Sequence, residues 1–297
     1  MGNSNTVKRK FTSVWLKVLI ALLAIYISML IAIYLGEMVE PDFIISRYTL
    51  QALVLSSLII TSLWVLRNVV DHHLPRSIGI GHLSDGLKKF FLGLGLFLIP
   101  ITLTITLTVV FGWGNVTFNS INLSVLGSGI LTVMLFEALP EELIFRGYIY
   151  THLTTDFAKW KASLITVLLF VISPVILVSI QRLLNINVTI GGASSITLSY
   201  ILSLIFFGVF VQYLRVLTNS VWTGVGFHLF FVYINRLIGT SSENLIQLSD
   251  VTDETPMQII LGISMLAVLA GLFLYPKISK HKLGWKEKTE LTAHPTE

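Results

Sequence analysis

The chain has 297 residues, of which 54% are hydrophobic and 12% are charged, and its mean hydropathy is +0.81. These values lie far from those of an average soluble domain and exclude a soluble globular fold. Cysteine is absent, which excludes disulfides and cysteine metal sites, and the net charge of +4 is spread over loop ends suited to anionic lipid, so we expect no nucleic-acid partner.

Eight apolar stretches are of the length, about 17 to 25 residues, that crosses a bilayer as a helix. They lie roughly at residues 14–35, 49–66, 90–111, 122–145, 162–183, 195–213, 219–239 and 257–275. The first lacks a small-residue cleavage site and is expected to be a retained span and not a signal peptide. The sequence predicts an all-α, polytopic membrane bundle of about eight transmembrane helices.

The distribution of Lys and Arg predicts how these spans are oriented. Basic residues gather at the N-terminus (residues 8–10), in the segment 67–89 and in the tail after residue 276, whereas the connections near residues 37–42 and 243–254 are acidic. Cytoplasmic loops of membrane proteins carry the excess of positive charge. Both termini are therefore expected in the cytoplasm, and membrane lipid is the expected surrounding.

The fourth span carries charges that an apolar helix does not need for folding. Glu137, Glu141, Glu142 and Arg146 lie inside or beside it, and ionisable groups at membrane depth are paired, face a polar interior or are functional. Glu142 and Arg146 are four residues apart and share a helix face, as an ion pair would, while Glu141 points about 100° away. Glu141 is thus the carboxylate left free for chemistry.

Pro140 offers a structural interpretation of the same carboxylates. We expect it to kink or restart the helix, so that Glu141 and Glu142 lie in a first helical turn. Negative charge is favoured at a helix N-terminus. From these residues alone, helix capping and catalysis are equally open.

The run Pro140-Glu-Glu-Leu-Ile-Phe-Arg-Gly-Tyr148 resembles the first motif of the CAAX protease and bacteriocin-processing family of intramembrane metalloproteases. Residues 162–170 resemble the helix that bears the family's Phe-x-x-x-His motif, and residues 206–228 resemble the segment that leads to its final histidine. The resemblance divides the chain into N-terminal transmembrane helices (1–119), a CAAX-protease-like core (120–240) and a final transmembrane helix with a basic cytoplasmic tail (241–297).

The resemblance implies a polar cavity, open to the cytoplasmic half, that is lined by Glu141, Glu142, Arg146 and His228. In the family a glutamate and a histidine activate water, while a second histidine and a following Asn bind metal or the oxyanion. This chain departs from that pattern, because Pro174 stands four residues after Phe170 where the family has His, and Val232 stands four after His228 where it has Asn. Neither side chain offers a ligand or a hydrogen-bond donor.

Zinc is the metal that the resemblance implies, with Glu141 and His228 as its expected ligands. A catalytic zinc uses about three protein ligands, so this set is incomplete even with Glu142 added. Glu137, one turn before Glu141, Asn235, seven residues after His228, and His152, near the cytoplasmic end, could compensate. The structural alternatives are that Glu137 snorkels, that Asn235 bonds a neighbouring helix and that His152 lies in a wet loop.

Two functions from different classes stay open. The first is an endopeptidase of a prokaryotic cell membrane that processes a peptide or a lipid-modified protein, with Glu141 activating water. The second is a non-catalytic homologue that binds a membrane peptide or a partner protein, in bacteriocin immunity or regulation. A transporter is disfavoured because the sequence lacks paired broken helices in two repeated halves.

Overall fold

The computed structural model describes residues 3–39, 47–71, 75–120, 122–184, 196–239, 244–249, 255–280 and 282–289. Their elements, in chain order, are α1 (Asn3–Glu37), α2 (Arg47–Val65), η1 (Leu66–Val70), η2 (Pro75–Ile78), α3 (Leu83–Val110), β1 (Asn115–Phe118), α4 (Leu123–Val133), η3 (Met134–Ala138), α5 (Leu139–Glu141), η4 (Glu142–Ile149), α6 (Tyr150–Asp156), α7 (Lys159–Leu183), α8 (Leu198–Thr218), α9 (Val221–Leu237), β2 (Ile238–Gly239), β3 (Ile246–Ser249) and α10 (Thr255–Ile278).

Seven described helices are long and apolar enough to cross a membrane, and the continuous helix from Leu123 to Asp156 is one of them. The eighth predicted span corresponds to α9, whose 17 residues cover about 25 Å at 1.5 Å per residue. That length falls short of a hydrocarbon core of about 30 Å. The predicted all-α membrane bundle is confirmed, with α9 as a short helix inside it. The orientation of the termini stays a prediction.

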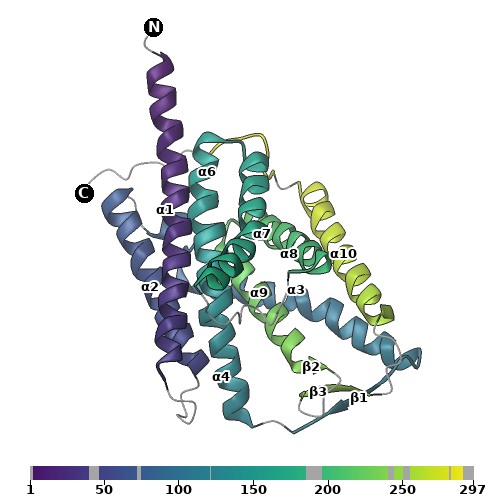
Figure 1. The fold of residues 1–297 in the computed structure, drawn as a ribbon. Helices are drawn as coiled ribbons and strands as arrows, with labels where there is room; N and C mark the ends of the chain where they lie inside the picture. Colours follow the sequence, from purple (N-terminus) through teal and green to yellow (C-terminus); the bar gives the residue numbers. More distant parts are fainter. Residues whose placement is uncertain are drawn as a thin grey trace.

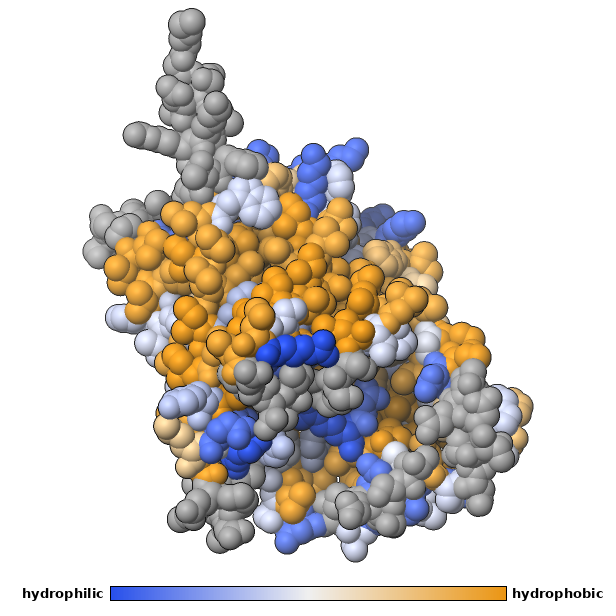
Figure 2. Space-filling model, viewed as in Figure 1, coloured by the Kyte–Doolittle hydropathy of each residue, from blue (hydrophilic) through white to orange (hydrophobic). Residues whose placement is uncertain are grey.

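Large apolar side chains cover the outer faces of these helices. On α1, Leu16, Leu19, Leu23 and Ile27 recur at helical spacing and are each about half exposed. Figure 2 shows the resulting apolar surface across the middle of the molecule, with hydrophilic residues gathered above and below it. Such a surface suits lipid and not water, because apolar side chains gain nothing from hydration.

The helices bring distant parts of the sequence together around the fourth span. In Figure 1, α1 runs beside α2, and α1 contacts both η4 and α6. The closest pairing is between α3 and α9, where the Gly93 Cα faces the backbone of Thr223 and the Gly226 Cα faces the backbone of Phe90. A side chain at either glycine would overlap the opposing backbone, so these glycines permit the close approach.

The fourth span does not restart at Pro140 as predicted. Its helical backbone runs unbroken from Leu123 to Asp156, and Pro140 is accommodated in the short segment α5 between the wide π-helical turns of η3 and η4. A π turn inserts extra backbone into the helix, which relieves the loss of the hydrogen bond that proline cannot make. Glu141 and Glu142 consequently lie in the middle of a helix, and the helix-capping interpretation is wrong.

A three-stranded sheet, which the sequence analysis did not predict, closes one end of the bundle. Its order is β1-β3-β2, with β1 antiparallel and β2 parallel to β3. The sheet lies at the end remote from the N-terminus (Figure 1) and joins the segment before α4 to the end of α9.

At the other end, the segment 282–289 is fixed across the connection between α6 and α7. Lys159 N donates to Glu287 O at 3.1 Å, Trp160 N to Trp285 O at 3.2 Å, and Thr289 N to Thr154 O at 2.9 Å. This part of the predicted cytoplasmic tail is therefore an ordered element, which we call the C-terminal strap.

Candidate functional site

The site is built around the carboxylate of Glu142, which the bundle buries completely. Its Oε1 accepts hydrogen bonds from Arg146 Nη1 at 3.1 Å and from His228 Nδ1 at 3.2 Å. Arg146 is also fully buried. The structure thus contains the predicted Glu142–Arg146 pair and adds His228, from α9, as a second partner of the same oxygen.

Neighbouring residues leave room for this group. A Cβ atom at Gly224 would lie 2.6 Å from Glu142 Oε2, so a larger residue there would displace the carboxylate. The Arg146 guanidinium lies over the ring of Phe170, 4.1 Å from its centroid, and the Phe207 ring packs edge-on against His228. The buried cation is therefore stabilised both by a carboxylate and by an aromatic face.

His228 lies between two carboxylates. While Nδ1 faces Glu142, Nε2 faces Glu141 Oε2 at 4.0 Å. The side chain of Glu141 is 24% exposed, in contrast to the buried Glu142. Glu141 is therefore the accessible carboxylate of the pair, as the sequence analysis predicted.

A cavity of about 350 Å³ opens beside Glu141 and His228. It is lined by residues of five helical segments: Met29, Phe136, Glu137, Glu141, Phe170, Pro174, Tyr200, Ser203, Leu204, Phe207, His228, Phe231, Val232, Asn235 and Arg236. Asn235 and Arg236 lie at the end of α9 that leads into the sheet, so the cavity extends toward the sheet and away from the N-terminal end of the bundle. The predicted opening to the cytoplasmic half stays a prediction, like the orientation of the termini.

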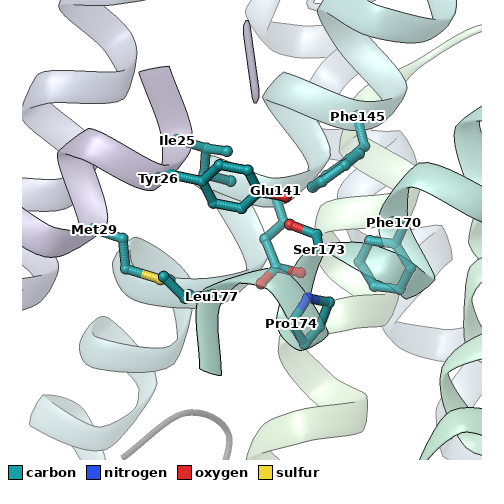
Figure 3. A pocket seen from close by; sticks show the side chains of 9 residues that line it. All are labelled: Ile25, Tyr26, Met29, Glu141, Phe145, Phe170, Ser173, Pro174 and Leu177. Atoms are coloured by element: carbon teal, nitrogen blue, oxygen red, sulfur yellow. The ribbon is translucent and has the colours of Figure 1, made fainter. Parts of the chain in front are cut away.

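A second cavity, of about 30 Å³, touches Glu141 from another direction. Figure 3 shows Glu141 among Tyr26 and Met29 of α1 and Ser173 and Pro174 of α7. The wall is mostly apolar, but Glu141, Tyr26 and Ser173 are polar, and a space of this size with such partners can hold a water molecule. Two hydroxyl groups, those of Tyr26 and Ser173, thus lie beside the accessible carboxylate.

Glu137 and Asn235 line the larger cavity, but both have partners. Glu137 forms an ion pair with Arg236, and Asn235 Nδ2 donates to Phe231 O of its own helix at 2.8 Å. Glu137 therefore has Arg236 as its charged partner, and Asn235 bonds its own helix instead of a neighbouring one.

His152 does not lie in a wet loop but in a buried network that ties α1, η1 and α6 together. Asp71 is the centre of this network, because it contacts His152 Nε2 at 2.9 Å, Arg67 Nη1 at 2.9 Å and Lys17 Nζ at 2.6 Å. Burial alone would raise the pKa of Asp71, but the hydrogen bonds and charges of His152 and Lys17 outweigh burial and hold that pKa below its ordinary value. His152 is thus committed to this network and not to the cavity.

The donor set at the cavity does not fit a catalytic zinc. The described residues contain no group of three or more His, Cys, Asp or Glu side chains arranged to hold a metal ion. Glu142 is fully buried and does not line the cavity, and Glu137 is paired with Arg236. Glu141 and His228 Nε2 are therefore the two donors left at the cavity wall, where about three are needed. Pro174 and Val232 line the cavity and add no donor.

Side chains of α1 and of the start of α8 also line the site, which the sequence did not predict. Tyr26 and Met29 are three residues apart, hence on one face of α1, and Tyr200 opens α8. Neutral side chains in an apolar helix give no charge signal, and the family resemblance did not extend to α1. Only the fold brings them to Glu141.

Residues 124–234 match the model of a protein family described as "Type II CAAX prenyl endopeptidase Rce1-like". The matched segment contains Glu141, Glu142, Arg146 and His228, and it confirms the resemblance drawn from the sequence motifs. No curated protein matches the chain.

Proposed function

Because residues 124–234 are an Rce1-like CAAX protease segment within a membrane bundle, we propose that the protein is a membrane endopeptidase acting on a peptide or lipid-modified protein. One observation supports this most strongly. His228 is held by a buried carboxylate on one side and faces the accessible carboxylate of Glu141 on the other, at the wall of a cavity of about 350 Å³. A histidine with a merely structural role would not need both carboxylates.

In the proposed reaction, Glu142 orients His228 and Glu141 is the general base. The carboxylate of Glu142 accepts a hydrogen bond from the Nδ1–H group of His228. In a neutral imidazole this leaves the Nε2 lone pair directed at Glu141. The 4.0 Å between Nε2 and Glu141 Oε2 is too long for a direct hydrogen bond but allows one water molecule to contact both atoms.

Hydrolysis then needs two proton transfers. Glu141 takes a proton from this water molecule as the water oxygen attacks the scissile carbonyl carbon. Glu141 then gives the proton to the nitrogen of the leaving amine as the carbon–nitrogen bond breaks. The tetrahedral intermediate requires a hydrogen-bond donor, which Val232 cannot supply. We assign this role to the hydroxyl group of Tyr200, which lines the same cavity.

A second candidate function rests on a separate observation. Pro174 and Val232, the two departures from the family pattern, both line the cavity. They make its wall more apolar where the family has polar groups. A non-catalytic homologue would use such a wall to bind a membrane peptide or a partner protein.

The experiment that tests the proposal compares the protein termini present in host membranes that express the wild type or Glu141→Gln at equal levels. Peptide ends that vanish in the variant would support the endopeptidase and identify its substrate. Asp85→Asn is the matched control, because Asp85 is an exposed carboxylate of α3 that contacts Lys89. If wild type and Glu141→Gln give the same termini while a deletion strain has a phenotype that Glu141→Gln rescues, the binding function replaces the endopeptidase.

A further inference from the structure

A third cavity, also of about 350 Å³, lies outside the candidate active site at the end of the bundle near the C-terminal strap. It is formed by η2, α6, the start of α7, the end of α8 and the strap, and its wall includes Thr151, Lys159, Arg215 and Lys282. It shares no residue with the cavity beside Glu141.

The charge of this cavity is one-sided. Lys159, Arg215 and Lys282 line it, and no Asp or Glu of the described chain does so. Lys159 Nζ donates to Leu283 O at 3.4 Å, and an anion in the cavity would be attracted by all three cations. The hydroxyl-rich remainder of the wall offers donors of the kind that phosphate oxygens accept.

Two side chains show that the cavity is built for a polar ligand. Thr151 lines the cavity and is 4% exposed, and its Oγ1 has no hydrogen-bond partner within the described parts of the chain. A buried hydroxyl without a partner is costly, so a ligand that bonds it is favoured. Arg215 is also 4% exposed and is held rigidly, because its Nε donates to Arg146 O at 2.9 Å and its Nη1 donates to Asn219 Oδ1 at 2.8 Å.

The cavity lies at the depth expected for lipid headgroups. Trp160, next to Lys159, is about half exposed at the start of α7, and exposed tryptophans mark the interface between membrane and water. Basic pockets between transmembrane helices at this depth suit the phosphate groups of anionic lipids. The bond from Arg215 to the Arg146 carbonyl also joins this cavity to the helix that carries Glu142.

We propose that this cavity binds a phosphate-bearing anion, with Lys159, Arg215 and Lys282 neutralising its charge and the Thr151 hydroxyl bonding one of its oxygens. The phosphate could come from an anionic lipid headgroup or from a soluble phosphate compound. Both sources use the same chemistry, and the experiment separates them.

The experiment compares the full-length wild type with Lys159→Gln/Lys282→Gln in two assays. Native mass spectrometry measures how strongly the detergent-solubilised protein retains phosphatidylglycerol relative to phosphatidylcholine. Thermal unfolding measures the stabilisation by inorganic phosphate relative to chloride at equal ionic strength. Lys286→Gln is the matched control, since it removes one charge from the same strap but does not line the cavity.

A lipid source is supported if the wild type selectively retains phosphatidylglycerol and the double variant loses this selectivity, by about fivefold for each lysine replaced. Stabilisation by inorganic phosphate that the double variant loses, without lipid selectivity, would support a soluble source. Thr151→Val should weaken whichever binding is found without changing net charge. The proposal is overturned if wild type and double variant behave alike in both assays, or if Lys286→Gln matches the loss per lysine.

Discussion

Glu142 is the residue on which the local electrostatics of the site depend. Burying a carboxylate is unfavourable unless its charge is neutralised and its oxygens are bonded. Arg146 supplies the charge from one turn along the same helix, and His228 supplies a second hydrogen bond from α9. Glu141, one residue earlier, has no such enclosure and faces the cavity. Two adjacent glutamates thus lie in different environments, because the helix turns Glu142 into the bundle and Glu141 toward the cavity.

Removing the charge of Arg146 should destabilise the whole protein. Arg146→Met leaves the buried carboxylate of Glu142 without its cation, a change that costs about 3–5 kcal/mol in comparable buried pairs. Thermal unfolding in detergent measures the effect. Arg182→Gln is the control, because Arg182 is an exposed arginine at the end of α7. An unchanged unfolding temperature for Arg146→Met would contradict the pairing.

Restoring a polar donor at position 232 should raise the peptidase activity if the cavity is catalytic. Val232 lines the cavity four residues after His228, so its replacement by Asn places an amide on the same helix face. A donor to an oxyanion is worth about 10²–10³ in rate, and we expect at least a tenfold gain from Val232→Asn. Cleavage of the substrate identified from the membrane termini is the measurement. Val232→Leu, which adds no donor, should show no gain.

At the scale of elements, close approach of helix backbones is what fixes His228 opposite Glu142. The α3–α9 contact at Gly93 and Gly226 places α9 deep in the bundle, and Gly224 on the same helix leaves space for the Glu142 carboxylate. Small residues at helix interfaces of membrane proteins allow two helix backbones to approach this closely. The position of the imidazole is therefore a consequence of glycines that have no chemical role of their own.

Two glycines of α3 provide a matched test of that contact. In Gly93→Ala the new methyl group would overlap the Thr223 backbone, whereas nothing lies within 4 Å of a Cβ atom at Gly95. We expect Gly93→Ala to lower the free energy of unfolding by about 1–3 kcal/mol, as overpacking does. Gly95→Ala should leave stability unchanged or raise it by up to about 1 kcal/mol, because alanine is the better helix former. Equal unfolding temperatures for the two variants would refute the contact.

At the scale of the whole molecule, buried charges join the N-terminal helices to the segment that matches the protease family. Lys17 of α1, Arg67 of η1 and His152 of α6 all contact Asp71. The N-terminal helices are thus joined to the fourth span by the hydrogen bond between Asp71 and His152, and α1 also contributes Tyr26 and Met29 beside Glu141. The matched segment and the N-terminal helices form one site together.

This network predicts how stability depends on pH. Because the pKa of Asp71 is held below its ordinary value of about 4, its contribution to stability is complete above that value and is lost as the pH falls through the lowered pKa. Thermal unfolding of wild type and Asp71→Asn between pH 3 and pH 7 should therefore show a stability difference that is constant above about pH 5 and shrinks below about pH 4. A difference that grows on acidification would contradict the assignment.

Much of this organisation follows from the sequence, and the rest depends on tertiary contacts. The lengths of the apolar stretches predict the membrane spans, and the four-residue spacing of Glu142 and Arg146 predicts their ion pair. The effect of Pro140 was mispredicted because π turns accommodate a proline without breaking the helix. His152 was misplaced because its partners lie on α1 and η1, and no local pattern relates positions so far apart.

The Asp71 network also bears on how the chain is made. Asp71 and His152 are separated by 81 positions, so at about 5–20 residues per second the ribosome adds the histidine roughly 4–16 seconds after the aspartate. Until then, Arg67 and Lys17 are the charged side chains of the described residues that contact Asp71. The contact between Asp71 and the fourth span can therefore form only after residue 152 has been synthesised.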